Sequence, residues 1–335
     1  MEQQMLLFRP LLEGGCMWRY ILRRIVLQGI PVLLGFTFLL YLIITIAPGS
    51  PVTHLRGVPD LDTAVIAQRE AQLGIDQPFL VQYAQWLLRV VRGDLGLSFD
   101  SARRPVLDLI KERMPATIIL SLSSIILGWG IGIPVGILSA RYQYSIFDYM
   151  ITFLAFVGIS IPSFFFGLIL LYVFALTLNM LPAGGFFMAG EPHTLLGYAR
   201  YLLLPALTLG LGSIASVARY MRSSLLEVLN EDYLRTARSK GLHENIVIYK
   251  HALRNALLPI LTLMGFMLPT IFSGAVIVEN IFTWPGLGSL AIQALSERNY
   301  PVIMGINLMF AVLIFLGSIL ADISYAFADP RIKYE

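Results

Sequence analysis

Charged residues are scarce in this sequence. Asp, Glu, Lys and Arg make up 13% of its 335 residues, whereas 57% are hydrophobic, and the mean hydropathy is +0.73. A soluble globular domain is typically about one quarter charged. So few charges cannot cover the surface of a soluble 37.3 kDa protein. The composition therefore predicts that much of the surface faces lipid.

Cysteine and histidine are also few, which argues against several kinds of site. The single cysteine, Cys16, excludes a disulfide within the chain and a cysteine metal site. All four histidines fall outside the long apolar stretches, and no H-E-x-x-H motif occurs. An intramembrane hydrolase or zinc enzyme is therefore not expected. No basic stripe with interleaved aromatic residues favours nucleic acid. We expect no catalytic residue, metal ligand or bound cofactor in this chain.

The N-terminus lacks the features of a cleavable signal peptide. Its first apolar run of about 23 residues is longer than a signal core, and no small-residue cleavage site follows it. The run therefore reads as a retained anchor. Met17 also begins a stretch typical of a protein start, which leaves two interpretations of residues 1–16, a genuine segment or a dispensable extension.

Long apolar stretches occur six times and predict an all-α, polytopic membrane protein, because a bilayer core needs about 20 apolar residues per helix. The predicted spans are 25–47, 116–140, 149–178, 201–218, 256–278 and 301–327. Proline occurs within or beside most of them. Neighbouring helices can satisfy the carbonyls that proline leaves free, so we expect kinks rather than breaks.

The distribution of Lys and Arg predicts the orientation of the spans. Fourteen of these residues fall in segments placed inside by a cytoplasmic N-terminus, whereas the two short outside loops carry only Arg200 and Arg298. Segments 1–24 and 328–335 are then cytoplasmic. The long segment 48–115 is expected to form an outward subdomain.

That outward segment contains a predicted amphipathic helix, Phe79 to Val91, with an aromatic face suited to a membrane interface or to a partner. The sequence Gly93-Asp94-Leu95-Gly96 predicts a turn after it. Pro105 is expected to begin a short helix that Pro115 ends.

The second span carries a small residue at every fourth position. The residues are Ser124, Gly128, Gly132, Gly136 and Ala140. This spacing is typical of a close contact between membrane helices. The alternative is that the stripe lines a conduit.

The cytoplasmic segment 219–255 is longer than a helix hairpin needs. Residues 230–241 predict a short helix with Asn230 as its N-cap and the acidic Glu231 and Asp232 in its first turn. Arg238 and Lys240 lie near its C-terminal end, and Gly241 can adopt the left-handed conformation that ends it. Tyr233 and Ala237 fall on one face. Such a helix either docks on a partner or is a solvated surface helix.

This segment resembles the EAA loop of ABC import permeases, in which a glutamate-alanine-alanine triplet precedes a glycine by three residues. Here Arg235-Thr236-Ala237 takes the place of the triplet, and Gly241 matches the glycine. The proline expected after His251-Ala252-Leu253 is replaced by Arg254. These departures resemble the dipeptide/oligopeptide branch (DppB/OppB type).

Seven further stretches are similar to that branch. They are Ala47-Pro48-Gly49-Ser50-Pro51, Leu73 to Pro78, Gly93 to Ser98, Arg104-Pro105-Val106, Trp284 to Gly288, Asn299 to Ile303 and Asp329 to Ile332. An acidic residue is common in similar sequences where Asn299 stands.

The resemblance implies a permease subunit of an importer in a bacterial or archaeal inner membrane. Its implied partners are membrane lipid, a second, homologous permease, one or two ATP-binding subunits and an extracytoplasmic binding protein. The chain has no G-x-x-x-x-G-K-[ST] loop, so ATP and magnesium would bind to the partner subunits. The residues implied to dock on an ATPase are Glu231, Asp232, Tyr233, Arg235, Thr236, Ala237, Arg238 and Gly241.

The transported solute stays open at this stage. Di- or oligopeptides are the first hypothesis, and nickel, other metal chelates or glutathione are alternatives within the family. An ion-coupled secondary transporter is the alternative of another class. Such proteins carry ionisable residues at mid-membrane depth, and here only Asp322 lies well inside a span, near the cytoplasmic end where it can serve as a cap or an interfacial residue.

Overall fold

A computed structural model describes residues 22–48, 51, 68, 70–72, 74–100, 102–186, 194–257, 259–260 and 275–328, with backbone alone for 320–328. The described residues are mostly helical, and the sole β-type pairing among them is an isolated bridge between Leu97 and Pro105. The predicted all-α class is therefore confirmed.

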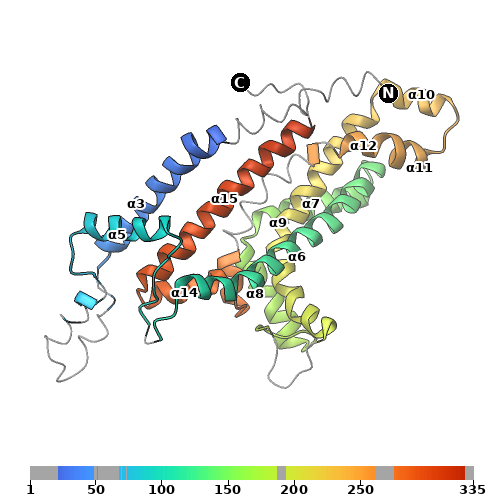
Figure 1. The fold of residues 1–335 in the computed structure, drawn as a ribbon. Coiled ribbons are helices and arrows are strands. Elements are labelled where there is room, and N and C mark those ends of the chain that lie inside the picture. Colours follow the sequence, from blue (N-terminus) through green and yellow to red (C-terminus); the bar gives the residue numbers. More distant parts are fainter. Residues whose placement is uncertain are drawn as a thin grey trace. The chain divides into compact units, whose positions relative to one another are not determined.

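The helices follow one another along the chain as drawn in Figure 1. They are η1 (Ile25–Gly29), α3 (Ile30–Ile46), α5 (Phe79–Val91), α6 (Val106–Arg141), α7 (Ile146–Ser160), α8 (Ser163–Leu170), η3 (Leu171–Thr177), α9 (Leu195–Leu229), α10 (Asp232–Ser239), α11 (Glu244–Ile246), η4 (Val247–Ala252), α12 (Leu253–Ala256), α14 (Leu287–Ser296) and α15 (Tyr300–Ala328). The segments labelled η are π-helical.

Four unbroken helices in the described part of the chain are long and apolar enough to span a membrane. They are Leu22–Ile46, Val106–Arg141, Leu195–Leu229 and Tyr300–Ile319. These helices contain or overlap the predicted spans 25–47, 116–140, 201–218 and 301–327. The predicted span 256–278 lies largely outside the described residues, so its helix is not part of this comparison.

The predicted span 149–178 is broken. The expectation that proline would only kink it was therefore wrong. Helices Ile146–Ser160 and Ser163–Thr177 meet at 107°. The break falls at Ile161, which is extended (φ −76°, ψ 126°), directly before Pro162. Proline disfavours the helical conformation of the residue before it and donates no backbone hydrogen bond. This pair is either one broken span or a re-entrant loop.

Two predicted helix ends also differ from the structure. Pro115 does not end a short helix, because α6 runs without interruption from Val106 to Arg141. The carbonyl four residues before Pro115 belongs to the exposed Lys111, where water can satisfy it. The fourth predicted span also continues beyond residue 218, since α9 ends at Leu229. The first 11 residues assigned to the cytoplasmic loop are thus helical.

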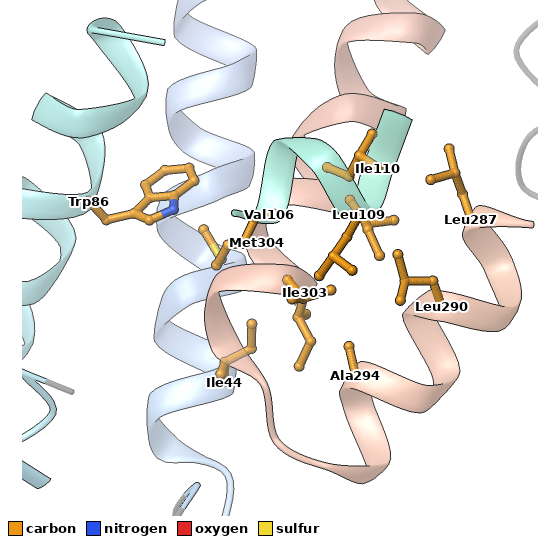
Figure 2. Close-up of a cluster of buried hydrophobic side chains, with 12 residues drawn as sticks. Ile44, Trp86, Val106, Leu109, Ile110, Leu287, Leu290, Ala294, Ile303 and Met304 are labelled. Carbon is orange, nitrogen blue, oxygen red and sulfur yellow. The ribbon is translucent and has the colours of Figure 1, made fainter. Parts of the chain in front are cut away.

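The chain divides into two compact units. Unit 1 comprises the described residues of Met1–Pro115 and Gly286–Phe315, and unit 2 those of Ala116–Pro285 and Leu316–Ile332. The core of unit 1, shown in Figure 2, joins Trp86 of α5 to Ile110 of α6, Leu290 of α14 and Met304 of α15. These apolar side chains pack the four helices against one another.

Helix α5 has the bounds predicted from its sequence, but its aromatic face packs inside unit 1. Tyr83 lies 5.3 Å from Phe38 of α3 between ring centroids, and Tyr41 of α3 lies 6.4 Å from Trp86. Trp86 is only 3% exposed. The aromatic side chains therefore fasten α5 across one end of α3 (Figure 1), rather than forming a free interface surface.

Candidate functional site: the short helix after α9

Helix α10 is an independent short helix separated from α9 by a single turn. Its N-cap is Glu231, which has extended backbone angles (φ −70°, ψ 143°) and makes no side-chain capping bond. The predicted N-cap, Asn230, instead ends α9 and donates its side-chain amide to the carbonyl of Leu226. The capping prediction was therefore wrong by one residue. At the other end, Gly241 has φ +76°, the left-handed conformation anticipated for it.

One face of α10 is buried in unit 2. Leu234 is 0% exposed and Ala237 is 8% exposed. Both belong to a core cluster with Met221 and Leu225 of α9 and Ile248 of η4. A helix of eight residues is marginal alone, so this packing stabilises it. Leu234, which sequence reasoning did not single out, is its best-buried side chain.

Polar contacts hold the two ends of α10 against the rest of the segment. Arg238 donates to both carboxylate oxygens of Glu244, at 3.2 and 3.0 Å, and to the carbonyl of Leu229 at 3.3 Å. The guanidinium holds the pKa of the Glu244 carboxyl below its usual range. The amide of Asn255 donates to the hydroxyl of Tyr233 at 2.7 Å. The helix is thus fixed to the structure that follows it.

The opposite face of α10 is exposed and polar. Arg235 has a side-chain exposure of 70% and lies 3.5 Å from Asp232, which is 95% exposed. Thr236 is exposed as well. The prediction that Tyr233 and Ala237 share an available face needs correction, because Ala237 points into the chain's own core while Tyr233 is 42% exposed at its edge. The available surface is centred on Arg235 and Thr236.

A buried ion pair braces the helix that carries α10. Arg222 of α9 donates to both oxygens of Asp148 of α7, at 2.6 and 2.7 Å. Asp148 is 1% exposed and also accepts hydrogen bonds from the Ser139 hydroxyl of α6 and from the Tyr144 backbone N–H. The hydrogen-bond donors to the Asp148 carboxylate therefore come from three parts of unit 2: α6, the turn before α7, and α9. Sequence reasoning missed this network, since the two charges are 74 residues apart.

The glycine stripe of α6 lies against α9. A methyl group built on Gly128 would lie 2.8 Å from Cβ of Ser213, and one on Gly132 would lie 2.9 Å from Cβ of Val217. A methyl group on Gly136 would lie 2.6 Å from Cβ of Met221. Real Cβ atoms do not approach other atoms so closely. The backbones of α6 and α9 can therefore meet here because glycine has no Cβ atom.

Asn299 occupies a buried position at the start of α15, within unit 1. Its Oδ1 accepts from the Phe99 backbone N–H at 3.0 Å, and its Nδ2 donates to the Ser98 hydroxyl at 2.7 Å. Asn299 is 4% exposed. A neutral amide thus satisfies one donor and one acceptor of the loop after α5. The side chain of Asp322 lies outside the described residues.

Long apolar helices with a short helix fixed to the end of one of them define a multi-pass helical membrane protein. The chain belongs to the family of binding-protein-dependent transport system inner membrane components. The model of that family matches residues 132–334, and the model of its N-terminal part matches residues 17–121. The chain is therefore a permease subunit of an ABC importer of the inner membrane.

Curated relatives match nearly the whole chain. The oligopeptide transport system permease protein AppB of Bacillus subtilis is 46% identical over 315 residues, which are 94% of this chain and 99% of that protein. The dipeptide transport system permease protein DppB of Escherichia coli is 38% identical, covering 95% of this chain and all of that protein. Among solved structures, an inward-facing MetNI methionine ABC transporter matches with a TM-score of 0.53. At 18% identity, over 66% of this chain and 96% of that one, it shows the fold alone.

Proposed function

We propose that this permease forms half of a translocation pathway for short peptides and that α10 couples it to ATP hydrolysis. Its partners in this proposal are a second, homologous permease, one or two ATP-binding subunits and an extracytoplasmic binding protein that selects the peptide. The names of the two curated relatives support peptides as the solute.

The observation that carries the coupling role is that α10 is buried on one face and exposed on the other. Leu234 and Ala237 fix the helix to α9 and η4, while Arg235 and Thr236 stay exposed on the other side. A helix seated in this way moves as a rigid body with the helices beneath it. ATP-driven movement of a subunit that grips the exposed face would thereby reach α9 directly.

The same proposal implies an orientation of the chain in the membrane. If α10 contacts a cytoplasmic ATPase, both termini are cytoplasmic and the segment containing α5 faces outward. The scarcity of Lys and Arg in the two short outside loops supports this orientation. An impermeant thiol reagent applied to intact cells should then label a cysteine placed at the exposed Leu88, but not one placed at the exposed Ser239.

Thr236→Trp tests the coupling role, because it adds bulk to the exposed face without entering the core. In complexes reconstituted with the partner subunits and binding protein, we expect ATP-dependent uptake of a labelled oligopeptide to fall at least roughly tenfold, as expected when well-packed contact is lost. Gln143→Trp, an equally bulky change in the exposed loop between α6 and α7, is the control and should leave uptake unchanged. Parent-level uptake by Thr236→Trp would refute the docking role. Uptake driven by an ion gradient without ATP would refute the importer itself.

A further inference from the structure

Unit 1 contains a pocket of about 370 Å³ that no part of the coupling mechanism uses. Its walls come from α3, α5, the described residues between 71 and 75 and between 94 and 103, and the start of α15. Trp86 and Met304, both nearly fully buried, are among its lining residues. The volume is within the range of small-molecule sites, roughly 300–1,000 Å³.

The wall of this pocket carries charged side chains that form no ion pair with the residues that the structure describes. Arg89 and Arg103 both line it, and neither side chain forms an ion pair with any residue that the structure describes. Asp94 is the sole carboxylate among the lining residues that the structure describes. It accepts from the Gly96 backbone N–H at 2.8 Å but makes no ion pair with described residues. Both signs of charge are thus available to a ligand.

Arg103 is held in a conformation that is unfavourable for its residue type. Its φ is +47°, in the left-handed region that disfavours side chains other than glycine. The backbone N–H of Arg103 donates to the Asp100 carboxylate at 2.8 Å, which helps to fix this geometry. Such strained residues persist where the surrounding structure imposes them, and they cluster at ligand sites.

The remaining polar groups divide into occupied and available ones. Gln82 accepts from the Tyr41 hydroxyl and donates to the carbonyls of Ile75 and Gln77, so it braces the wall. Gln85 is exposed and makes no side-chain hydrogen bond with described residues. The buried indole N–H of Trp86 also has no acceptor among them. A buried donor without an acceptor is rare in folded proteins.

We propose that this pocket binds a short zwitterionic peptide, with its carboxylate at Arg89 and Arg103 and its ammonium group at Asp94. Guanidinium groups match carboxylates in shape and charge, and the Gln85 amide can pair with the peptide bond. Tyr41 and Trp86 offer apolar ring surface to a peptide side chain. This inference rests on the proposed function. It adds a site on the permease itself for the solute that the binding protein delivers.

Equilibrium binding of radiolabelled dialanine tests the site. The probe is added to the whole permease–ATPase complex in nanodiscs, without the binding protein. Arg89→Gln and Arg103→Gln should each weaken binding roughly tenfold or more, because each removes a charge-assisted hydrogen bond. Asp94→Asn keeps the acceptor for Gly96 and should weaken binding as well. Arg92→Gln, an exposed neighbour outside the pocket, should bind like the parent.

Chemical variants of the probe show whether its charged ends are what the pocket binds. Dialanine with an acetylated amino end and an amidated carboxyl end should fail to bind. If inorganic phosphate binds at the arginines and dialanine does not, the pocket is an anion site of another kind and the proposal is wrong. Undetectable binding of dialanine to the parent complex would also overturn it.

ATP-dependent import with the binding protein present separates this inference from the proposed function. If the parent complex imports peptides but the arginine variants bind dialanine like the parent, the site is wrong and the function stands. If the complete parent system imports no peptide, the proposed function fails as well.

Discussion

Helices α5 and α10 are both short, lie outside the spans and have one apolar face, yet they leave different surfaces free. Each buries its apolar face in its own unit, through Trp86 in α5 and Leu234 in α10. The free surface of α5 still includes large apolar side chains such as Leu88, whereas that of α10 is centred on Arg235 and Thr236. An apolar face alone therefore does not identify a docking surface, because the chain itself can cover it.

The largest effect is expected from a charge on the buried face of α10. Leu234→Asp places a carboxylate in a fully buried position, and an unpaired buried charge costs several kcal/mol. The helix should detach from α9, trypsin should cleave faster after Arg235 and Arg238, and uptake should be abolished. Ala237→Glu should act in the same way. Arg235→Asp, on the exposed face, removes one of these trypsin sites but should leave the rate of cleavage after Arg238 unchanged while it reduces uptake.

Removing the aromatic anchor of α5 should have a smaller and more local effect. Trp86→Ala should destabilise unit 1 by about 3–5 kcal/mol, the usual cost of truncating a buried tryptophan. Hydrogen exchange of the α5 amides should speed up accordingly. Leu88→Ala, on the exposed side, should change stability by less than about 0.5 kcal/mol. Equal effects of the two substitutions would contradict the packing of α5 on α3.

Both helices end at a glycine in the left-handed region, which permits a matched pair of substitutions. Gly93 has φ +80° and Gly241 has φ +76°, and neither has an atom within 4 Å of where a Cβ would lie. Alanine at either position should cost about 1–2 kcal/mol through the backbone alone. Thermal denaturation should show similar losses for Gly93→Ala and Gly241→Ala. The fall in coupled ATP hydrolysis should be much larger for Gly241→Ala than for Gly93→Ala.

The smallest effect is expected from the ion pair between Arg238 and Glu244. Its Glu244 carboxyl has a lowered pKa in the folded protein, so the pair stabilises the fold above the ordinary carboxyl pKa and loses that contribution as the pH falls through the folded value. Both side chains are partly exposed, at 39% and 48%, which limits the contribution to about 1 kcal/mol. Glu244→Gln should therefore lower the thermal denaturation midpoint slightly at pH 7. It should also remove the loss of stability that this ion pair causes as the pH falls.

Helix α5 and the four unbroken spans could be predicted from the sequence because composition and periodicity decide them. The effect of proline could not. Ile161-Pro162 breaks the third predicted span, whereas Ile133-Pro134 remains inside α6, although the restriction on the residue before proline is the same. The local sequence does not distinguish these positions, so contacts with the rest of the fold decide between a break and a continuous helix.

The candidate site was predictable in its position but not in its inward and outward faces. The residues of α10 and the left-handed Gly241 follow from local sequence signals. The burial of Ala237 does not, because it depends on η4 and α9 packing beneath the helix. The pairing of Asp148 with Arg222 likewise joins residues far apart in the chain, which one sequence without relatives cannot reveal.

Site-directed cross-linking tests most directly whether the exposed face of α10 docks on the ATP-binding subunit. In a Cys16→Ser background, which removes the chain's single native thiol, Thr236→Cys and Leu88→Cys variants are paired with single surface cysteines along the groove of the ATP-binding subunit. A short bismaleimide should join Thr236→Cys to that subunit in the assembled complex and leave Leu88→Cys unlinked. A complex that imports peptides yet links through Leu88→Cys and not through Thr236→Cys would contradict the account.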